Sequence, residues 1–142
     1  MVPDTPIRRT AIRSPLTYAA ELTTLAAMTE RSLQEPTVLL LTALADAPKH
    51  GYALMQEVEA MSAGRVRLRT GTLYGALDRL LHQGLISVDS EEVVDGRMRR
   101  TYALSEAGRE VLAAEAERLR ATADEAGRRL AAGRARVQAA GA

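Results

Sequence analysis

The repeat of apolar residues changes abruptly at Gly84, and no other feature of the chain limits its possible folds as much. Before Gly84, leucines recur at the spacing of one helix face: Leu73, Leu77 and Leu80, with Leu81 at the edge. After it, apolar residues take alternate positions, as in half-buried strands: Ile86, Val88, Met98, Tyr102 and Leu104. The sequence therefore predicts a helix that ends at Gly84 and leads into a β-hairpin.

The hairpin turns at Asp95-Gly96, and the length of its loop decides which residues pair. A two-residue turn would set Tyr102 opposite Asp89 and scatter the apolar face. A three-residue loop of residues 94–96, with Gly96 in a bulge, pairs Tyr102 with Val88 instead. We therefore expect the three-residue loop.

Two more helices are predicted before this one. The first begins at Pro36, which suits a first helical turn, and ends at Asp46-Ala47-Pro48. We expect it to be largely buried through Val38, Leu39, Leu41, Thr42 and Leu44. The second begins near His50-Gly51-Tyr52, closes in Ser62-Ala63-Gly64, and has one apolar face of Leu54, Val58 and Met61. Three helices and a two-stranded wing make a mainly α fold with a small β-hairpin, the winged helix-turn-helix.

The helix that ends at Gly84 has a second face, opposite its leucines, which suits DNA. Thr72, Gly75, Arg79 and His82 recur along it, so it offers hydrogen-bonding groups with little bulk. A glycine costs about 1 kcal/mol relative to alanine in a helix interior, and close approach of a DNA groove is one reason to tolerate it. We expect Thr70 or Thr72 to cap this helix, so that its free N–H groups point at a phosphate.

The net charge of the 142-residue chain is only +1, so the local distribution of charge matters more than the total. Arg65, Arg67 and Arg69 alternate just before the helix, with no acidic residue between Glu59 and Asp78. A second basic cluster, at the expected hairpin, follows four acidic residues and consists of Arg97, Arg99 and Arg100. A local basic face is enough to bind phosphate, although either cluster alone is usually a solvated surface.

Composition excludes several other classes of protein. The chain has no cysteine, which rules out disulfides and cysteine-based metal sites, and His50 and His82 have no partner at metal-ligand spacing. The longest apolar run, Val38 to Leu41, cannot span a bilayer, and residues 1–13 lack the apolar centre of a signal peptide. We therefore expect a cytoplasmic protein. No catalytic triad or glycine-rich phosphate loop occurs, so we expect neither an enzyme nor a cofactor.

The remaining segments define the predicted domain organisation. Residues 1–14 form a flexible basic arm, and residues 15–33 form an additional helix that serves either dimerisation or packing. Residues 34–104 form the winged helix-turn-helix domain. Residues 105–142, rich in alanine, glutamate and arginine, form a long helix capped by Ser105, with a break near Gly127 left open. Its apolar seam consists of Leu112, Ala116, Leu119, Ala123, Ala126, Leu130 and Val137.

Together, these motifs resemble the PadR family of bacterial transcriptional regulators from Pro36 to Leu112. The matching segments are His50-Gly51-Tyr52, Thr70-Gly71-Thr72-Leu73-Tyr74, Gly84-Leu85-Ile86, Asp95-Gly96-Arg97 and Arg100 to Gly108. The resemblance implies a homodimer that binds a partly palindromic DNA operator, usually as a repressor and in some members released by a small molecule. The helix after the wing would form the dimer interface, as in members with a short tail.

The resemblance also implies roles for individual residues. Tyr52 and Tyr74 would contact the DNA backbone, Thr72 and Gly75 would face the groove, and Arg97 would lie at the wing tip. The full predicted DNA-binding set is Lys49, His50, Tyr52, Arg65, Arg67, Arg69, Thr70, Thr72, Tyr74, Gly75, Arg79, Arg97 and Arg99.

Alternatives stay open beside these roles. The two tyrosines can lay their rings on the protein surface, and His50 can cap its own helix. A winged-helix module that binds protein instead of DNA is the alternative function. The absence of tryptophan and phenylalanine argues against an aromatic ligand-stacking pore at the dimer interface.

Overall fold

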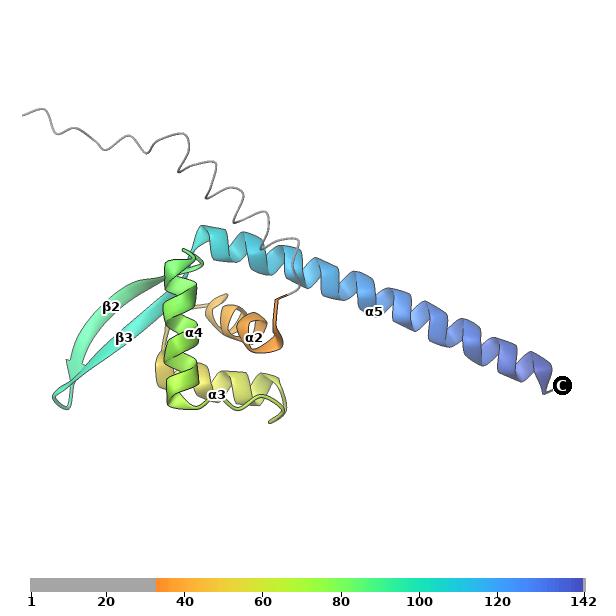
Figure 1. Cartoon of the computed structure of the whole chain (residues 1–142), viewed down its shortest axis with the longest axis horizontal. Helices are drawn as coiled ribbons and strands as arrows, with labels where there is room; N and C mark the ends of the chain where they lie inside the picture. Colours follow the sequence, from red (N-terminus) through yellow and green to blue (C-terminus); the bar gives the residue numbers. More distant parts are fainter. Residues whose placement is uncertain (1–32, 142) are drawn as a thin grey trace, which may run out of the picture. The chain divides into compact units, whose positions relative to one another are not determined.

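The structure, a computed structural model, describes residues 33–141. Its elements are, in order, α2 (Glu35–Leu44), β1 (Lys49–His50), α3 (Gly51–Met61), α4 (Thr70–His82), β2 (Ile86–Val94), β3 (Arg97–Leu104) and α5 (Glu106–Ala140) (Figure 1). This is the mainly helical winged helix-turn-helix that the sequence predicts. The basic arm predicted over 1–14 lies outside the described residues, as does the helix predicted over 15–33 except for its last residue.

Helices α2, α3 and α4 share an aliphatic core. Leucines from all three helices are completely buried: Leu40, Leu41, Leu54, Leu73 and Leu77. The predicted core face of α4 is confirmed, since Leu80 is also buried and Leu81 lies at the edge. Two predicted core positions are wrong. Thr42 is exposed because it lies opposite Leu40 on α2, and Met61 is exposed because α3 ends there and Ser62 takes the next buried position.

Gly84 ends α4 as predicted. Its backbone has a φ of 72°, a left-handed conformation that glycine adopts without strain. The Gly84 N–H donates to the Leu81 carbonyl, and the Leu85 N–H donates to the Leu80 carbonyl. This pair of bonds is the Schellman motif, and it directs the chain from α4 into β2.

The sheet has three antiparallel strands in the order β1-β3-β2. Strand β1 pairs Lys49 with Tyr102 and His50 with Thr101. The sequence did not predict this strand, because two residues are too few to show a strand period. Its consequence is that the start of α3 is attached to the base of the wing.

The predicted three-residue hairpin loop is wrong. Val94 pairs with Arg97 across a two-residue turn, in which Asp95 and Gly96 have φ of 51° and 74°. Positive φ at both positions is the turn type that Asp-Gly favours between twisted strands. The predicted pairing of Val88 with Tyr102 is nevertheless present, because the register shifts between Val88 and Ser90. Asp89 is the extra residue of a β-bulge, which restores the apolar face below it.

Helix α5 begins where predicted. The Ser105 Oγ accepts a hydrogen bond from the Gly108 N–H and donates one to the Gly84 carbonyl. A Cβ on Gly108 would lie 2.0 Å from the Leu85 carbonyl oxygen, so only glycine lets α5 pack this closely on the end of α4.

Helix α5 is continuous over all of its 35 residues, so the break considered near Gly127 does not occur. Figure 1 shows its C-terminal half extending past the other helices of the described chain. None of the described helices is long and apolar enough to cross a membrane.

Candidate nucleic-acid interface

The loop of residues 62–69 presents its arginines outward because alternate residues are anchored inward. Leu68 is buried between two exposed arginines, and the buried Ser62 Oγ accepts a hydrogen bond from the Val66 N–H at 3.0 Å. An extended chain alternates its side chains, so Arg65, Arg67 and Arg69 all face solvent. Sequence reasoning missed Ser62, since nothing local distinguishes a buried serine from an ordinary loop serine.

The face of α4 opposite its leucines is open, as predicted. Thr72, Gly75 and Arg79 are exposed, and a Cβ built on Gly75 would meet no atom within 4 Å. The same holds for Gly71, one helical turn earlier, which the predicted set omitted. Its spacing of four residues from Gly75 was the available signal. Two glycines therefore form a smooth strip on α4 that nothing within the described chain requires.

The predicted cap of α4 is wrong. Arg69 holds the N-cap position and has no side-chain cap hydrogen bond, while Thr70 is the first helical residue. Neither threonine caps the helix, because both already lie inside its first turn. The first N–H groups of α4 thus have no side-chain cap, which leaves the positive end of the helix dipole beside Arg69.

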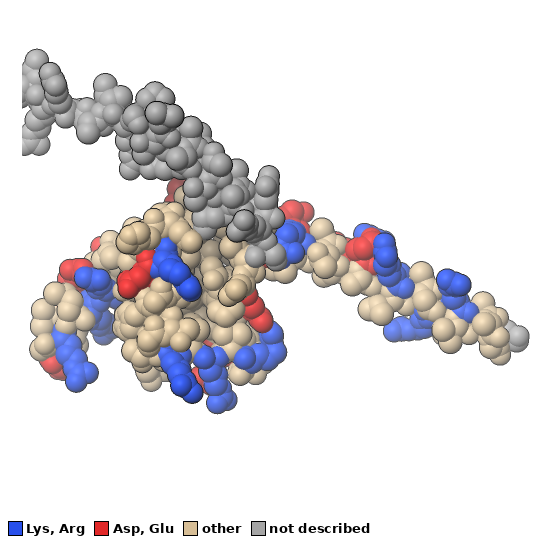
Figure 2. All heavy atoms as spheres, viewed as in Figure 1, with Lys and Arg blue, Asp and Glu red and all other residues tan. Residues whose placement is uncertain are grey.

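The exposed arginines differ in their ion pairs. Arg65 lies 2.6 Å from the Glu35 carboxylate, and Arg67 lies 3.2 Å from that of Glu59. Within residues 33–141, no ion pair involves Arg69, Arg79, Arg97 or Arg99. Figure 2 shows basic side chains along the lower edge of the winged-helix elements, from the wing tip to the region below α3 and α4.

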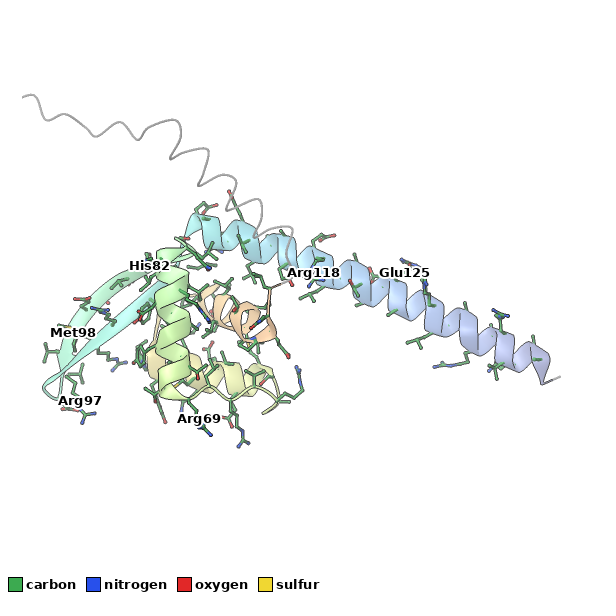
Figure 3. The ribbon with its side chains drawn as sticks, in the orientation of Figure 1. Arg69, His82, Arg97, Met98, Arg118 and Glu125 are labelled. Carbon is green, nitrogen blue, oxygen red and sulfur yellow. The ribbon has the colours of Figure 1, made fainter. Side chains whose placement is uncertain are left out.

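The wing divides its charges between its two strands. Strand β3 has Arg97, Arg99 and Arg100 without an acid, whereas β2 has Asp89, Glu91 and Glu92 without a base. Only one cross-strand ion pair forms, between Arg100 and Glu91 at 2.8 Å. In Figure 3, Arg97 at the wing tip and Arg69 at the start of α4 both project at the lower edge, while His82 lies at the other end of α4.

The three tyrosines within residues 33–141 occupy different environments. Tyr52 is 65% exposed at the start of α3, and Tyr74 is 46% exposed. The Tyr74 ring lies over Gly51, where a Cβ would come within 2.8 Å of the phenol oxygen. Gly51 is therefore the residue that lets Tyr74 bridge α4 and α3. Tyr102 is buried in the wing base, and burial raises the pKa of its phenol.

Lys49 and His50 have structural contacts instead of open positions. The Lys49 ammonium donates to the Ala43 carbonyl and the Asp46 carboxylate and lies 3.4 Å from Glu57, so we remove it from the predicted DNA-binding set. His50 caps α3, since its Nδ1 accepts from the Ala53 N–H at 3.3 Å. Burial, followed by the nearby Arg99 cation, lowers the pKa of His50, which favours the neutral ring that such a cap requires.

The chain matches the model of the transcriptional regulator PadR-like family over residues 40–114. It is 46% identical over 79 residues to an uncharacterized 37.1 kDa protein in transposon TN4556 of Streptomyces fradiae, and 46% identical over 68 residues to the transcriptional regulator Rv3488 of Mycobacterium tuberculosis. These matches cover 56% and 48% of this chain, and 21% and 60% of the two relatives. The chain thus spans less than two thirds of the length of either relative.

A solved structure of a PadR family transcription regulator from Clostridium difficile has the same fold. It superposes with a TM-score of 0.57 at 23% identity, over 68% of this chain and 99% of that one. The family match covers more than half of the chain and includes α3, α4, the wing and the start of α5. This chain therefore belongs to the PadR-like family of transcriptional regulators.

Proposed function

We propose that the chain is a homodimeric repressor that places α4 in the major groove of a partly palindromic operator. The observation that supports this most is the strip of Gly71 and Gly75 on α4, where added side chains would meet nothing in the described protein. Each glycine costs the helix about 1 kcal/mol relative to alanine. A groove that must come close to the helix backbone accounts for both.

Side chains around this strip supply the polar contacts. Thr72 and Arg79 would face base edges, while Arg69, Thr70 and the uncapped start of α4 would hold a phosphate. Arg97 and Arg99 would contact the flanking backbone from the wing. Arg65 and Arg67 are tied to carboxylates and would contribute less.

The tyrosines would complete the backbone contacts. Tyr52 and Tyr74 have exposed rings on α3 and α4, the two helices of the helix-turn-helix. Tyr74 would be the better positioned of the two, because its ring is held over Gly51. His50, as the cap of α3, would act through the position of that helix.

A dimer is part of the proposal because a helix-turn-helix reads two half-sites about 34 Å apart. Helix α5 would supply the dimer contact, since its apolar residues beyond Leu119 are exposed. The bound dimer would repress by covering its operator, and a small molecule that favours a different dimer geometry would release it.

Selection of bound DNA from a random pool of duplexes tests the proposal. A two-fold symmetric motif is the expected result, and recovery of no enriched motif would contradict it. The variant Gly75→Leu should then lose binding to the selected motif while melting no lower than the parent, because leucine favours helix. A matched control, Ala121→Leu on an exposed part of α5, should retain binding.

A winged helix that binds protein is the second candidate function. One feature of the wing favours it, namely the acidic side chains of β2. The acidic residues of β2 oppose DNA on that edge of the hairpin. The dependence of affinity on salt distinguishes the two functions. The affinity for an operator falls steeply as salt rises, whereas the affinity for a protein partner that does not use Arg69 and Arg97 would be largely independent of salt.

A further inference from the structure

The tip of the wing bears an apolar pair of side chains that nothing within residues 33–141 covers. Val93 on β2 pairs with Met98 on β3, and the two residues are 69% and 61% exposed. Directly opposed residues of antiparallel strands lie on one face of the sheet, so the two side chains are neighbours. Met98 also shares a face of β3 with Tyr102, which is buried at the wing base. The apolar face of the wing therefore continues past the core to the tip.

The stability of the hairpin does not account for this pair. Most of each side chain stays in contact with solvent after pairing, and two threonines would fit the same strands without exposing apolar surface. The turn is specified by Asp95 and Gly96, whose positive φ values suit these two residue types. Val94, on the other face of β2, is 37% exposed as well. Apolar side chains gathered at an exposed tip indicate a contact surface.

We propose that Met98 is an apolar wedge that enters the minor groove of DNA beside each half-site, with Val93 packed against the sugars next to it. The inference rests on the proposed function, which uses only arginines from the wing, and adds an apolar contact to it. Apolar side chains that enter the minor groove push between base steps and kink the duplex. Steps that unstack easily, such as TA and CA, would therefore be preferred beside each half-site.

The shape of the tip suits this groove. The minor groove is only about 6 Å wide, so it cannot admit a helix but can admit a side chain from a tight hairpin. Met98 lies close to the two-residue turn, near Arg97 at the end of the wing (Figure 3). Its side chain is unbranched and flexible, and it can fill an irregular gap between base pairs. Val93, which is branched at Cβ and stiff, would support it from the side.

The charges around the pair favour DNA as its partner. Arg97 and Arg99 immediately precede and follow Met98, and neither has an ion pair within residues 33–141. Both guanidinium groups are therefore free to bind the phosphates that border a groove. Figure 2 shows uncharged surface at the wing tip with basic side chains beside it. Arg97 projects at the same edge as Arg69, so the tip lies on the side where α4 would hold the duplex (Figure 3).

Selection from a random pool of duplexes, with the parent and with Met98→Gln, tests the wedge. Glutamine keeps the length of the side chain and replaces the thioether with an amide. The parent should enrich a symmetric core motif with a flexible step on each flank, and Met98→Gln should enrich the same core without that step. Met61→Gln is the matched control, because Met61 is an exposed methionine at the end of α3, outside the wing. It should retain both the core and the flanks.

Binding to the site that the parent selects gives a second measurement. Met98→Gln should weaken affinity several-fold without changing its dependence on salt, because the substitution removes no charge. Bending of the bound duplex, measured by energy transfer between dyes at its two ends, should decrease in the same variant. Val93→Thr should have a smaller effect in the same direction. Both variants replace exposed residues, so they should melt close to the parent.

The possible outcomes separate this inference from the proposed function. Equal flanking preference and equal bending for the parent and Met98→Gln would reject the wedge and leave the operator intact. Loss of the core motif in Met98→Gln, together with a lower melting temperature, would assign Met98 to the fold and also reject the wedge. A parent that enriches no motif at all would reject the proposed function and the wedge with it.

Discussion

The winged-helix elements and the distal half of α5 use leucine in opposite ways. Leu40, Leu54 and Leu77 have no exposed surface, whereas Leu119 and Leu130 are 46% and 70% exposed. Burying a leucine contributes about 1.5–3 kcal/mol, so the first group stabilises the fold within one chain. The second group has no such cover from residues 33–141. The comparison separates a part whose leucines are buried within the described chain from a part whose leucines are not.

The largest expected effect comes from removing a core leucine. Leu77→Ala should lower the free energy of unfolding by about 2–5 kcal/mol, because it leaves a cavity where α4 meets the core. Leu130→Ala should change the free energy of unfolding of the isolated subunit by less than about 0.5 kcal/mol and should weaken the proposed dimer instead. Urea unfolding over a range of protein concentrations distinguishes the two. If the loss of stability depended on protein concentration in Leu77→Ala and not in Leu130→Ala, the roles assigned to the two leucines would be reversed.

Two glycines give a second comparison between a packed position and an open one. Gly108→Ala should destabilise the protein by about 1–3 kcal/mol, because its Cβ would overlap the Leu85 carbonyl and backbone would have to move. Gly75→Ala should stabilise it by up to about 1 kcal/mol, since its Cβ has open space in a helix interior. Thermal unfolding of both variants is the measurement. A Gly108→Ala protein as stable as the parent would mean that α5 is not held against Leu85.

Two glutamates, each with an arginine three residues later, allow a buried and an exposed ion pair to be compared by the pH dependence of stability. Glu115 is 4% exposed beside Arg118, while Glu125 is 46% exposed beside Arg128. The Arg118 hydrogen bond holds the pKa of Glu115 below its ordinary 4.5, despite burial. A lowered pKa in the folded state stabilises the protein above pH 4.5, and that stability is lost as pH falls through the folded pKa.

Glu115→Gln should therefore flatten the loss of stability in acid, measured as unfolding free energy between pH 7 and pH 3. Glu125→Gln should leave the pH profile almost unchanged, because water and salt screen its ion pairs. Equal profiles for the two variants would show that the burial of Glu115 has no energetic consequence.

The smallest effect concerns DNA affinity. Arg69→Ala should flatten the dependence of operator affinity on salt by about one unit, as expected for one lost phosphate contact. Arg134→Ala on distal α5 should leave that slope unchanged. Fluorescence anisotropy at several salt concentrations measures both. An unchanged slope for Arg69→Ala, or a reduced one for Arg134→Ala, would contradict the division of roles between the two regions.

Much of the architecture follows from the sequence alone because it depends on neighbouring residues. The leucine spacing of α4, the stop at Gly84 and the Ser105 cap are interactions over a few residues, so a local pattern is sufficient to predict them. The order of three helices and a two-stranded hairpin likewise predicts the winged helix-turn-helix arrangement, and the family resemblance implies the same fold. The openness of Gly75 was likewise predicted from its face of the helix.

Tertiary structure alone decided the features that join residues far apart in the chain. The pairing of Arg65 with Glu35, the strand contact between His50 and Thr101, and the Tyr74 ring over Gly51 all depend on how elements pack. The bulge at Asp89 belongs to this class too, since the turn at Asp95 favoured one register and the buried Tyr102 required another. A local pattern cannot resolve such a conflict, because the energy that decides it comes from contacts that exist only in the folded chain.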